Sequence, residues 1–571
     1  MQITNGRAMP VSRNAISQLA LALTLGAAVT SVWAQAVPTP GAIQDQLRRP
    51  PAMPPAAQPA TPFVAPTPAH GVPAGGRKIL IQGFDIIGSS AISPAELQTV
   101  VAPYAGKELT LQEIYDVADQ VTRYYREHGY TLASAIVPEQ KVSSGQIQLQ
   151  VIEGRLGKIT VEGNQHYRSN FILWQLNDLQ PGEVVTSAPL EHEILMLNDL
   201  PGLDARAVMQ PGADFGTSDL VVQTQETPLE GDLQVNNYGR ESLGQYQIQA
   251  DAALNGLLGI GDRFDFSGLY ASADLLHYGR AAYSMPVSPW GTRASVYYSG
   301  YDYHVNAKTL GASVAALDIN GDGQNFGVNF LHPVWRAPRK NLFIGVGYDR
   351  TVTSQTESTL NTLSSANLSL AQFTALFNYQ APDQSFSTVG ATLSTNFQGS
   401  PLVLDAAGGL VPENNTEAAK LQVDLSHFRD VWQKLGLLTR FTGVVSADPL
   451  VDLDQFRLGG PTSVRAYPTS EVGGDQGFFA SAELQHPVSF LPALASQRVK
   501  AFIDTGTVYR KKSEVRGVRA EDSLSGAGVG WSATALGRVA VDLLLAHPIG
   551  QHQTSDQNEG LRVWFSVNAQ Y

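Results

Sequence analysis

From residue 229 to residue 571 the chain alternates apolar and polar side chains in short segments, and this alternation restricts the fold more than any other feature. A period of two puts successive side chains on opposite faces of a strand, and Gly, Asn and Asp between segments are typical of turns. The segments are 262–269, 294–298, 342–348, 421–425, 478–484 and 499–504. Sixteen strands would have about 21 residues each with their connections, which fits membrane-crossing strands of roughly ten residues. We therefore predict a 16-stranded antiparallel transmembrane β-barrel over residues 229–571.

The end of the chain distinguishes this barrel from its alternative, a soluble all-β domain or propeller. Apolar Val563, Phe565, Val567, Ala569 and Tyr571 alternate with a second set of mostly polar residues. An apolar face that ends in an aromatic residue is typical of a last, lipid-facing strand. Phe565 and Tyr571 are the candidates for a signature that the barrel assembly machinery reads when the protein is inserted into the outer membrane.

The N-terminus has the three regions of an export signal. Arg7 and Arg13 precede an apolar stretch at 19–29, and Val32-Trp33-Ala34 offers a cleavage site before Gln35. The alternative is a transmembrane helix, but the stretch is shorter than the roughly 20 residues that a helix needs to cross a bilayer. Residues 1–34 are therefore predicted to be a signal peptide. The chain has no cysteine, which suits passage through an oxidising compartment.

Composition and motifs argue against several other classes of protein. The chain has 38 Lys and Arg against 51 Asp and Glu, a formal charge of −13, whereas nucleic-acid binders have a basic face. Without cysteine there is no thiolate zinc site or thiol nucleophile, and the 11 histidines form no metal-spaced cluster. Residues 318–323 match half of an EF-hand loop, but position twelve is Asn329, so an Asn-Gly surface turn is predicted there. Alternating Gly526, Gly528 and Gly530 are expected to relieve crowding on one barrel face. We predict no catalytic residues, metal or cofactor.

A proline-rich segment follows the export signal at residues 35–77. Eleven of the residues between 38 and 73 are proline, which fixes φ and removes amide donors, so this segment is predicted to be an extended linker. Residues 42–49 can form at most two helical turns. Two alternatives remain for them, a short helix that plugs the barrel or a frayed tail.

An internal repeat precedes the barrel and predicts two tandem α+β modules, at 78–154 and 155–228. Residues 79–83 resemble 159–163 at an offset of 80, and later strand residues repeat at an offset of 73. Each copy is predicted to have the order strand, helix, helix, strand, strand. In the first copy Ser93 and Thr110 begin helices with capping boxes, and Gly129 ends the second of these helices.

Two short motifs lie in the second half of the barrel. Val464, Arg465, Ala466 and Tyr467 lie in a Gly-rich connection between two strands. Downstream, Phe502, Asp504 and Gly506 share one face of a strand, and a carboxylate on that face must point to the lumen rather than to lipid. We therefore expect Arg465 and Asp504 to pair inside the barrel.

With these motifs the chain resembles the two-partner secretion transporters (the TpsB family), also called haemolysin secretion/activation proteins, of the outer-membrane assembly superfamily. The resemblance implies two POTRA modules in the periplasm and a 16-stranded barrel. It implies that a loop folds back into the lumen, where the Arg of a Val-Arg-Gly-Tyr motif meets the Asp of a Phe-x-Asp-x-Gly strand. Here these are Arg465 and Asp504, and the departure is Ala466 in place of Gly. If that position needs φ above zero, Ala466 is strained.

The function predicted on this basis is secretion. An unfolded exoprotein (an adhesin, haemolysin or toxin) would bind to the POTRA modules by adding a strand of its own to the edge of a module sheet. The barrel would then pass the exoprotein outward without ATP. The alternatives are a factor that assembles other barrels, or a passive porin or receptor. The sequence leaves open the identity of the client and whether 42–49 plugs the pore.

Overall fold

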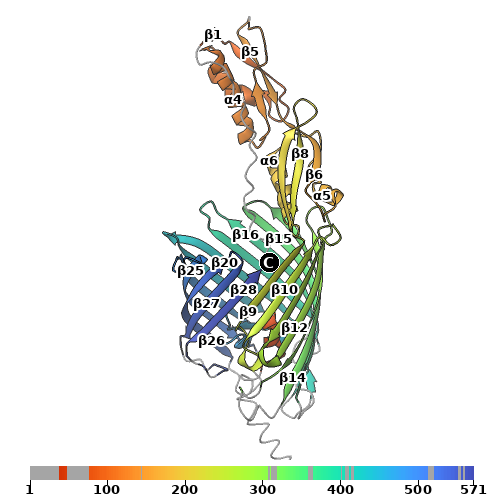
Figure 1. Ribbon diagram of the computed structural model, residues 1–571, viewed down its shortest axis with the longest axis vertical. Helices are drawn as coiled ribbons and strands as arrows, with labels where there is room; N and C mark the ends of the chain where they lie inside the picture. Colours follow the sequence, from red (N-terminus) through yellow and green to blue (C-terminus); the bar gives the residue numbers. More distant parts are fainter. Residues whose placement is uncertain are drawn as a thin grey trace, which may run out of the picture.

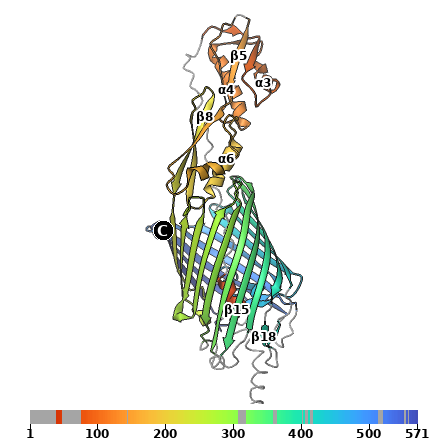
Figure 2. The same cartoon turned by 90° about the vertical axis from the view of Figure 1, so that its right-hand side faces the viewer.

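The computed structural model describes residues 38–47, 76–142, 144–306, 309, 318–357, 364–399, 402–404, 410–412, 417–511, 520–550, 554–556, 558 and 560–571. The segment predicted to be a signal peptide lies outside these residues. Two small modules are stacked end to end above one mouth of a closed barrel (Figures 1 and 2). Among the described residues, no helix is both long and apolar enough to cross a bilayer.

The barrel predicted from the alternation is confirmed, and its strands are antiparallel throughout. Sixteen strands of the described chain form its wall: β9 (Leu229–Asn236), β10 (Gln247–Asn255), β11 (Arg263–Ala271), β12 (Leu276–Pro286), β13 (Arg293–His304), β14 (Ile319–Arg336), β15 (Lys340–Glu357), β16 (Ser364–Gln380), β17 (Phe386–Gly399), β20 (Ala419–Trp432), β21 (Leu435–Ser446), β24 (Gln476–Pro487), β25 (Ala495–Tyr509), β26 (Glu521–Ala535), β27 (Val539–Pro548) and β28 (Arg562–Gln570). A short hairpin of β18 (Leu402–Leu404) and β19 (Leu410–Pro412) extends β16 beyond the wall.

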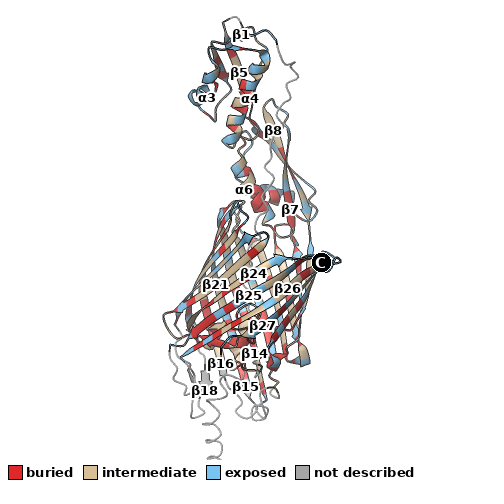
Figure 3. Cartoon of the chain, turned by 90° about the vertical axis from the view of Figure 1, so that its left-hand side faces the viewer, coloured by how far each residue is buried: buried red, intermediate tan, exposed pale blue. Residues whose placement is uncertain are grey.

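The first and last strands close the wall. β28 pairs with β9 over five positions, from Ser566 opposite Asn236 to Gln570 opposite Asp232. Along β28, Val563 and Val567 are exposed while Trp564 is buried, so the two faces predicted for the C-terminal strand are confirmed. Buried residues gather in the half of the barrel farther from the modules (Figure 3).

The Asn-Gly surface turn predicted at residues 318–323 is wrong, because residues 319–323 are paired with the neighbouring strands as the start of β14. The two glycines have a packing role there. A Cβ at Gly321 would lie 2.3 Å from the hydroxyl of Tyr303, and one at Gly323 would lie 2.2 Å from the ring of Tyr301. These positions therefore lack a side chain so that two lumenal tyrosine rings can lie across the strand.

Both modules have the predicted order of elements. The first contains β2 (Gly83–Ile87), α3 (Pro94–Val101), α4 (Leu111–Glu127), β4 (Ser134–Ile136) and β5 (Gln146–Ile152), with the small pair β1 (Ile79–Leu80) and β3 (Glu108–Leu109) beside it. The second contains β6 (Arg155–Glu162), α5 (Ser169–Gln175), α6 (Ser187–Asn198), β7 (Leu203–Pro211) and β8 (Thr217–Glu226). In each sheet the last strand is central, and it pairs parallel to the first strand and antiparallel to the fourth element.

The predicted helix starts and the end at Gly129 are confirmed, but only half of the capping box predicted at Ser93 forms. The hydroxyl of Ser93 accepts a hydrogen bond from the backbone N–H of Glu96. Thr110 and Glu113 form a complete capping box, and Gly129 follows α4 with φ +89°. The long helix α4 buries one apolar face against the sheet, which is the packing that stabilises a helix of this kind in water.

The predicted alignment of the repeat is wrong in its first strand. Gly88 and Gly163 are equivalent, at an offset of 75 rather than 80, because a Cβ on either would lie 2.4 Å from a carbonyl oxygen of the module's last strand, that of Val151 or Thr224. Residues 79–80 instead form the small pair beside the module. Short apolar segments look alike whichever strand they form, so sequence similarity alone placed the wrong pair in register.

A glutamate at the end of the last strand organises the equivalent loop in each module. Glu153 accepts hydrogen bonds from the backbone N–H groups of Ser90 and Ala91, at 2.6 and 2.7 Å. Glu226 accepts three from residues 165–167, at 2.7–3.1 Å. Desolvation raises the pKa of each carboxyl, but these hydrogen bonds outweigh it and lower the pKa. The charged glutamates therefore fix the loop that leads from the first strand into the first helix.

Glu193 on α6 is in the opposite situation. It is buried on the core-facing side of the helix, and its Oε2 atom has no hydrogen-bond partner among the described residues. Desolvation and the nearby charge of Asp178 raise the pKa of Glu193 to about 7, from an ordinary value of 4.5. Its folded state therefore binds a proton more tightly than its unfolded state.

We predict that the second module loses stability between pH 5 and pH 8 because of Glu193. The contribution of a group with a raised pKa is full below the unfolded pKa and is lost as pH rises through the folded pKa of about 7. Chemical denaturation of residues 76–228 should give a free energy of unfolding about 2–3 kcal/mol lower at pH 8 than at pH 5. Glu193→Gln should flatten this profile and Glu191→Gln should not; an unchanged slope in Glu193→Gln would contradict the assignment.

Candidate functional site

The connection between β21 and β24 folds back into the barrel. It contains a short 3₁₀ turn η5 (Asp452–Asp454) and two small strands, β22 (Phe456–Leu458) and β23 (Val472–Gly474), which pair with each other and form a separate two-stranded sheet. Val464, Ala466 and Tyr467 of this lumenal loop (residues 447–475) are almost fully buried. The sequence motif at 464–467 therefore lies inside the barrel, against the wall.

Arg465 is held by two carboxylates of the wall. Its Nε and Nη2 atoms donate to the two oxygens of Asp504, each at 2.8 Å, and its backbone N–H donates to Asp504 Oδ2 at 3.2 Å. Its Nη1 forms an ion pair with Glu483 on β24. The three side chains are only 3%, 1% and 5% exposed, so the ion pairs are shielded from water. Removing one partner of such a buried pair leaves an uncompensated charge, which costs several kcal/mol.

Aromatic rings complete the site. The guanidinium carbon of Arg465 lies 3.4 Å from the centre of the Phe502 ring, a cation–π contact. The indole N–H of Trp564 on β28 donates to the carbonyl oxygen of Arg465 at 2.6 Å. The last strand of the barrel therefore binds the backbone of the loop at Arg465, while β24 and β25 bind the Arg465 side chain.

Glycines in the wall make room for the loop. A Cβ at Gly506 would lie 2.9 Å from Leu458 of the loop, and one at Gly526 would lie 2.3 Å from the Cβ of Ala466. At Gly528 and Gly530 it would lie 2.5 Å from Phe502 and Leu544, so the expected relief of crowding along this strand is confirmed. Ala466 itself has no positive φ, so the departure from the family glycine carries no backbone strain.

The structure brings the sequence-predicted residues of the loop and of β25 into one cluster. Sequence reasoning missed Glu483, Ser481 and Trp564, which complete the shell around Arg465. Glu483 and Ser481 are two residues apart on β24 and so share the face that points into the lumen. This shared face is the one sequence signal that could have identified them. Nothing in the local sequence indicates that they face Arg465, since this follows from the register of β24 on β25, where Ser481 lies opposite Asp504.

A helix also lies inside the barrel. Of the two alternatives for residues 42–49, the described part forms helix α2 (Pro40–Leu47), and Figure 2 shows it within the ring of strands. Ile43 and Leu47 join an apolar cluster with Tyr301, Tyr303 and other lumenal residues of the wall. Gln44 exchanges hydrogen bonds with Asn325 on β14 at 3.2 and 3.3 Å. These contacts are those of a plug rather than of a frayed tail.

The plug helix contacts the lumenal loop as well as the wall of the barrel. Asp452 of the loop accepts from the backbone N–H of Gly41 at 2.7 Å and from the hydroxyl of Thr39 at 3.0 Å, so it satisfies one of the free amides at the start of α2. A Cβ at Gly41 would lie 2.2 Å from the carbonyl oxygen of Asp452, so only glycine fits. One turn further along the same face of the helix, Ser470 donates to Asp45 at 2.6 Å.

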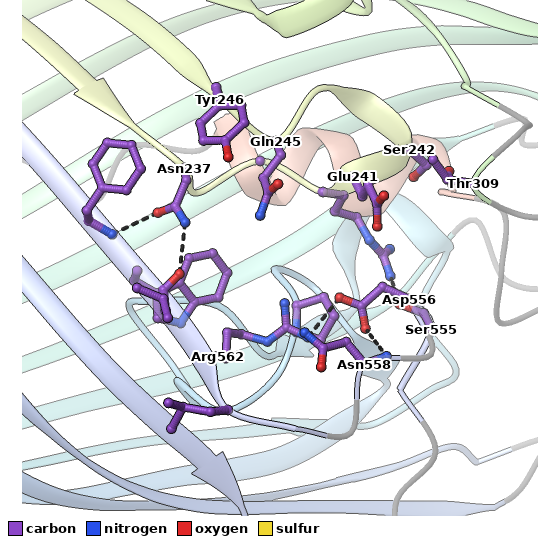
Figure 4. Close-up of a pocket in the computed structure, with 17 residues that line it drawn as sticks. Asn237, Glu241, Ser242, Gln245, Tyr246, Thr309, Ser555, Asp556, Asn558 and Arg562 are labelled. Atoms are coloured by element: carbon purple, nitrogen blue, oxygen red, sulfur yellow. Dashed lines mark hydrogen bonds and ion pairs between the residues drawn. The ribbon is translucent and has the colours of Figure 1, made fainter.

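At the rim farther from the modules, the lumenal loop contacts the residues where β28 and β9 close the barrel. A cavity of about 480 Å³ lies between the β9–β10 connection and the residues before β28. Figure 4 shows its lining residues, with α2 behind them. β9 ends at Asn236, and the side chain of the next residue, Asn237, extends the pairing between β9 and β28. Its amide donates to the carbonyl oxygen of Val563 and accepts from the N–H of Phe565, both at 2.8 Å. Beside it, Glu471 of the loop binds Arg240 and Ser555.

The chain has relatives among known proteins. Residues 216–533 match the model of the haemolysin secretion/activation protein ShlB/FhaC/HecB family, and residues 79–154 match the ShlB-type POTRA domain. The chain belongs to this family. It is therefore an outer-membrane transporter of two-partner secretion, and its modules are POTRA modules, as predicted.

Individual relatives are distant but cover most of the chain. The heme/hemopexin transporter protein HuxB of Haemophilus influenzae is 24% identical over 492 residues, 83% of each protein. The hemolysin transporter protein ShlB of Serratia marcescens is 25% identical over 455 residues, 77% of each. The solved structure of CdiB from Escherichia coli shares the fold, with a TM-score of 0.67, 21% identity and coverage of 90% of this chain and 94% of that one.

We predict that Arg465→Ala lowers the heat resistance of the folded barrel, because Asp504 and Glu483 then lie buried without a countercharge. The expected cost is about 3–5 kcal/mol while both stay charged. Adding Glu483→Gln to this variant should restore part of the loss by removing one of the two charges. The measurement is the temperature at which the purified barrel loses its compact form in gel electrophoresis. Arg498→Ala, an exposed arginine on the same strand as Asp504, is the control. Equal midpoints for the two arginine variants would refute the pairing as a stabilising contact.

Proposed function

We propose that this transporter captures an unfolded exoprotein in the periplasm with its POTRA modules and passes it through its own lumen without ATP. The observation that carries the proposal is how the lumen is filled. Neither the loop nor α2 is hydrogen-bonded into the wall as a strand, and β22 and β23 pair only with each other among the described strands. Both segments are held by side-chain contacts and caps. They can therefore move without opening the ladder that keeps the barrel closed.

The modules offer places for an extended chain to bind. In the first sheet the outer strands are β2 and β4, and in the second they are β6 and β7. An unfolded segment can add to such an edge through backbone hydrogen bonds, without requiring a particular sequence. The second module is fastened to the mouth of the barrel. Arg336 at the end of β14 forms a two-pronged pair with Asp199 at 2.7 Å, and it also donates to Asn341. A client bound there is next to the entrance of the lumen.

The client we propose is a large secreted protein of the haemolysin, adhesin or toxin type, and its folding outside the cell gives the transport its direction. Names in the family support this class, since ShlB is a hemolysin transporter and HuxB a heme/hemopexin transporter. For the protein's own insertion, we propose that Phe565 and the exposed Tyr571 form the signature that the barrel assembly machinery reads.

A deletion strain tests the function directly. Loss of one large exoprotein from the medium, with unchanged levels of other outer-membrane barrels, is the result expected of a secretion transporter. A general loss of barrels would instead identify an assembly factor. Altered solute uptake alone would identify a porin. Complementation with Arg465→Ala or Asp504→Ala should leave the barrel inserted but impair secretion, and the double variant should be no worse than the worse single one.

We predict that tying α2 to the loop blocks secretion. The chain has no cysteine, so Asp45→Cys with Ser470→Cys creates a unique pair where the two side chains now touch. Bridging this pair with a short, reductively cleavable bismaleimide should stop release of the client, and cleavage should restore it. The control is Thr505→Cys with Ser525→Cys, which joins two neighbouring wall strands at side chains 2.8 Å apart. Normal secretion by the bridged Asp45–Ser470 pair would show that the plug and loop need not separate.

We also predict that the two modules alone, residues 76–228, are soluble and bind the N-terminal region of the client while it is unfolded. Each module has its own apolar core, so the fragment should fold without the barrel. Calorimetry should detect binding to the unfolded segment and none to the natively folded client. Equal affinity for both forms would remove the recognition step from the proposed mechanism.

A further inference from the structure

Two large apolar side chains are exposed side by side on the second module. Leu173 and Trp174, on the short helix α5, are 38% and 43% exposed. Trp174 contacts Phe171 on the same face of the helix, with ring centres 5.6 Å apart. Exposed apolar pairs of this size on a small module often mark a contact surface. What this surface meets is decided by its position relative to the barrel.

The residues before α5 rest directly on the β10–β11 turn (residues 256–262) of the barrel. The backbone N–H of Arg168 donates to the carbonyl oxygen of Gly259 at 3.0 Å. Gly256, Gly259 and Gly261 all have positive φ. A Cβ on these three would lie 3.0 Å from the ring of Tyr167, 2.7 Å from the His166 carbonyl and 3.1 Å from the ring of Phe171, respectively. Aromatic rings of the module therefore pack directly on the glycine backbone of the turn. This contact fixes the height of α5 above the rim of the barrel.

The same turn presents its own apolar pair. Leu257 and Leu258 are 62% and 50% exposed, and the fully buried Asp262 holds the turn by accepting from the N–H of Leu258. From the turn the apolar surface continues down the outer wall. Leu254 on β10 lies opposite Phe264 on β11, whose ring stacks on that of Phe266 at 4.7 Å. The apolar surface of the turn is thus continuous with the lipid-facing wall of the barrel.

Aromatic side chains elsewhere at this rim show where the bilayer surface lies. Trp290, Trp335, Trp432 and Phe490 are exposed in the other turns, or in the strand ends beside them, at the module end of the barrel. Tryptophan is favoured at the interface between hydrocarbon and headgroups, and barrels carry such a belt at each membrane surface. In Figure 1, α5 lies over the edge of the barrel rather than over its mouth, as a residue of that belt requires.

We propose that Leu173 and Trp174, together with Leu257 and Leu258, insert into the headgroup region of the periplasmic phospholipid leaflet. The second module is then seated on the membrane as well as on the barrel, so its edge strands keep a fixed position at the entrance of the lumen. Arg168, exposed beside α5, adds attraction to lipid phosphates. This inference rests on the outer-membrane location of the barrel and does not depend on the proposed capture of a client.

Site-directed spin labelling of the full chain tests the proposal, because the absence of cysteine makes each introduced label unique. Asn170→Cys labels α5 one turn before Trp174 and leaves all four apolar residues in place. Phe215→Cys, at the 78% exposed tip of the β7–β8 hairpin, is the water-exposed control. In nanodiscs of phosphatidylethanolamine and phosphatidylglycerol, relaxation by a water-soluble nickel chelate should be lost at position 170 and retained at position 215.

A second variant shows whether the apolar pair causes the protection. In Leu173→Gln with Trp174→Gln, the label at position 170 should become as accessible to nickel as the label at position 215, while the barrel keeps its heat resistance. Equal nickel access at positions 170 and 215 in the otherwise unchanged protein would overturn the proposal. Protection at position 170 that appears only after an unfolded client segment is added would also overturn it and assign the surface to the client.

Discussion

The charge of Arg465 is buried inside the barrel, and the placement of the lumenal loop depends on how that charge is neutralised. A guanidinium removed from water needs both countercharge and hydrogen bonds to remain there. Asp504 and Glu483 supply them from neighbouring strands, and the ladder between these strands fixes both carboxylates relative to each other. The guanidinium therefore has one favourable position, and the loop backbone is held where its carbonyl meets Trp564.

Once the loop is fixed there, it supports the plug helix and the rim of the barrel. Asp452 caps the start of the plug helix, Ser470 binds its side, and Glu471 joins the rim at Arg240 and Ser555. These interactions are polar, and when such groups separate in a wet lumen, water takes over most of their hydrogen bonds. Breaking these polar contacts therefore costs far less than opening the wall. Under the proposed function, this difference in cost is what lets a closed barrel conduct a polypeptide.

The two ends of the barrel are held together by different kinds of interaction. At the rim farther from the modules, charged side chains of the loop and of the strand connections bind one another around a cavity. At the module end, three glycines let the second POTRA module approach the backbone of the β10–β11 turn, while Glu226 fixes the loop that makes the contact. A polar rim can rearrange in water, whereas a close-packed contact of aromatic rings against a glycine backbone has few alternatives. The second POTRA module is thereby held in place on the rim.

Sequence alone determined the features that depend on periodicity and local chemistry. The period of two specified the barrel and the faces of β28, and the capping residues Ser93 and Thr110 specified the helix ends. The lumenal phase of Asp504 followed in the same way. Tertiary structure decided the remaining features. The register of β24 on β25 brought Glu483 to Arg465, and the space over Gly321 and Gly323 turned a predicted Asn-Gly turn into part of a strand. The packing of Ile43 and Leu47 made a plug of a segment whose sequence allowed a tail. Periodicity specifies which face a side chain occupies, but the neighbour across the strand, the loop or the lumen is set only when distant segments compete for the same space and the same charges.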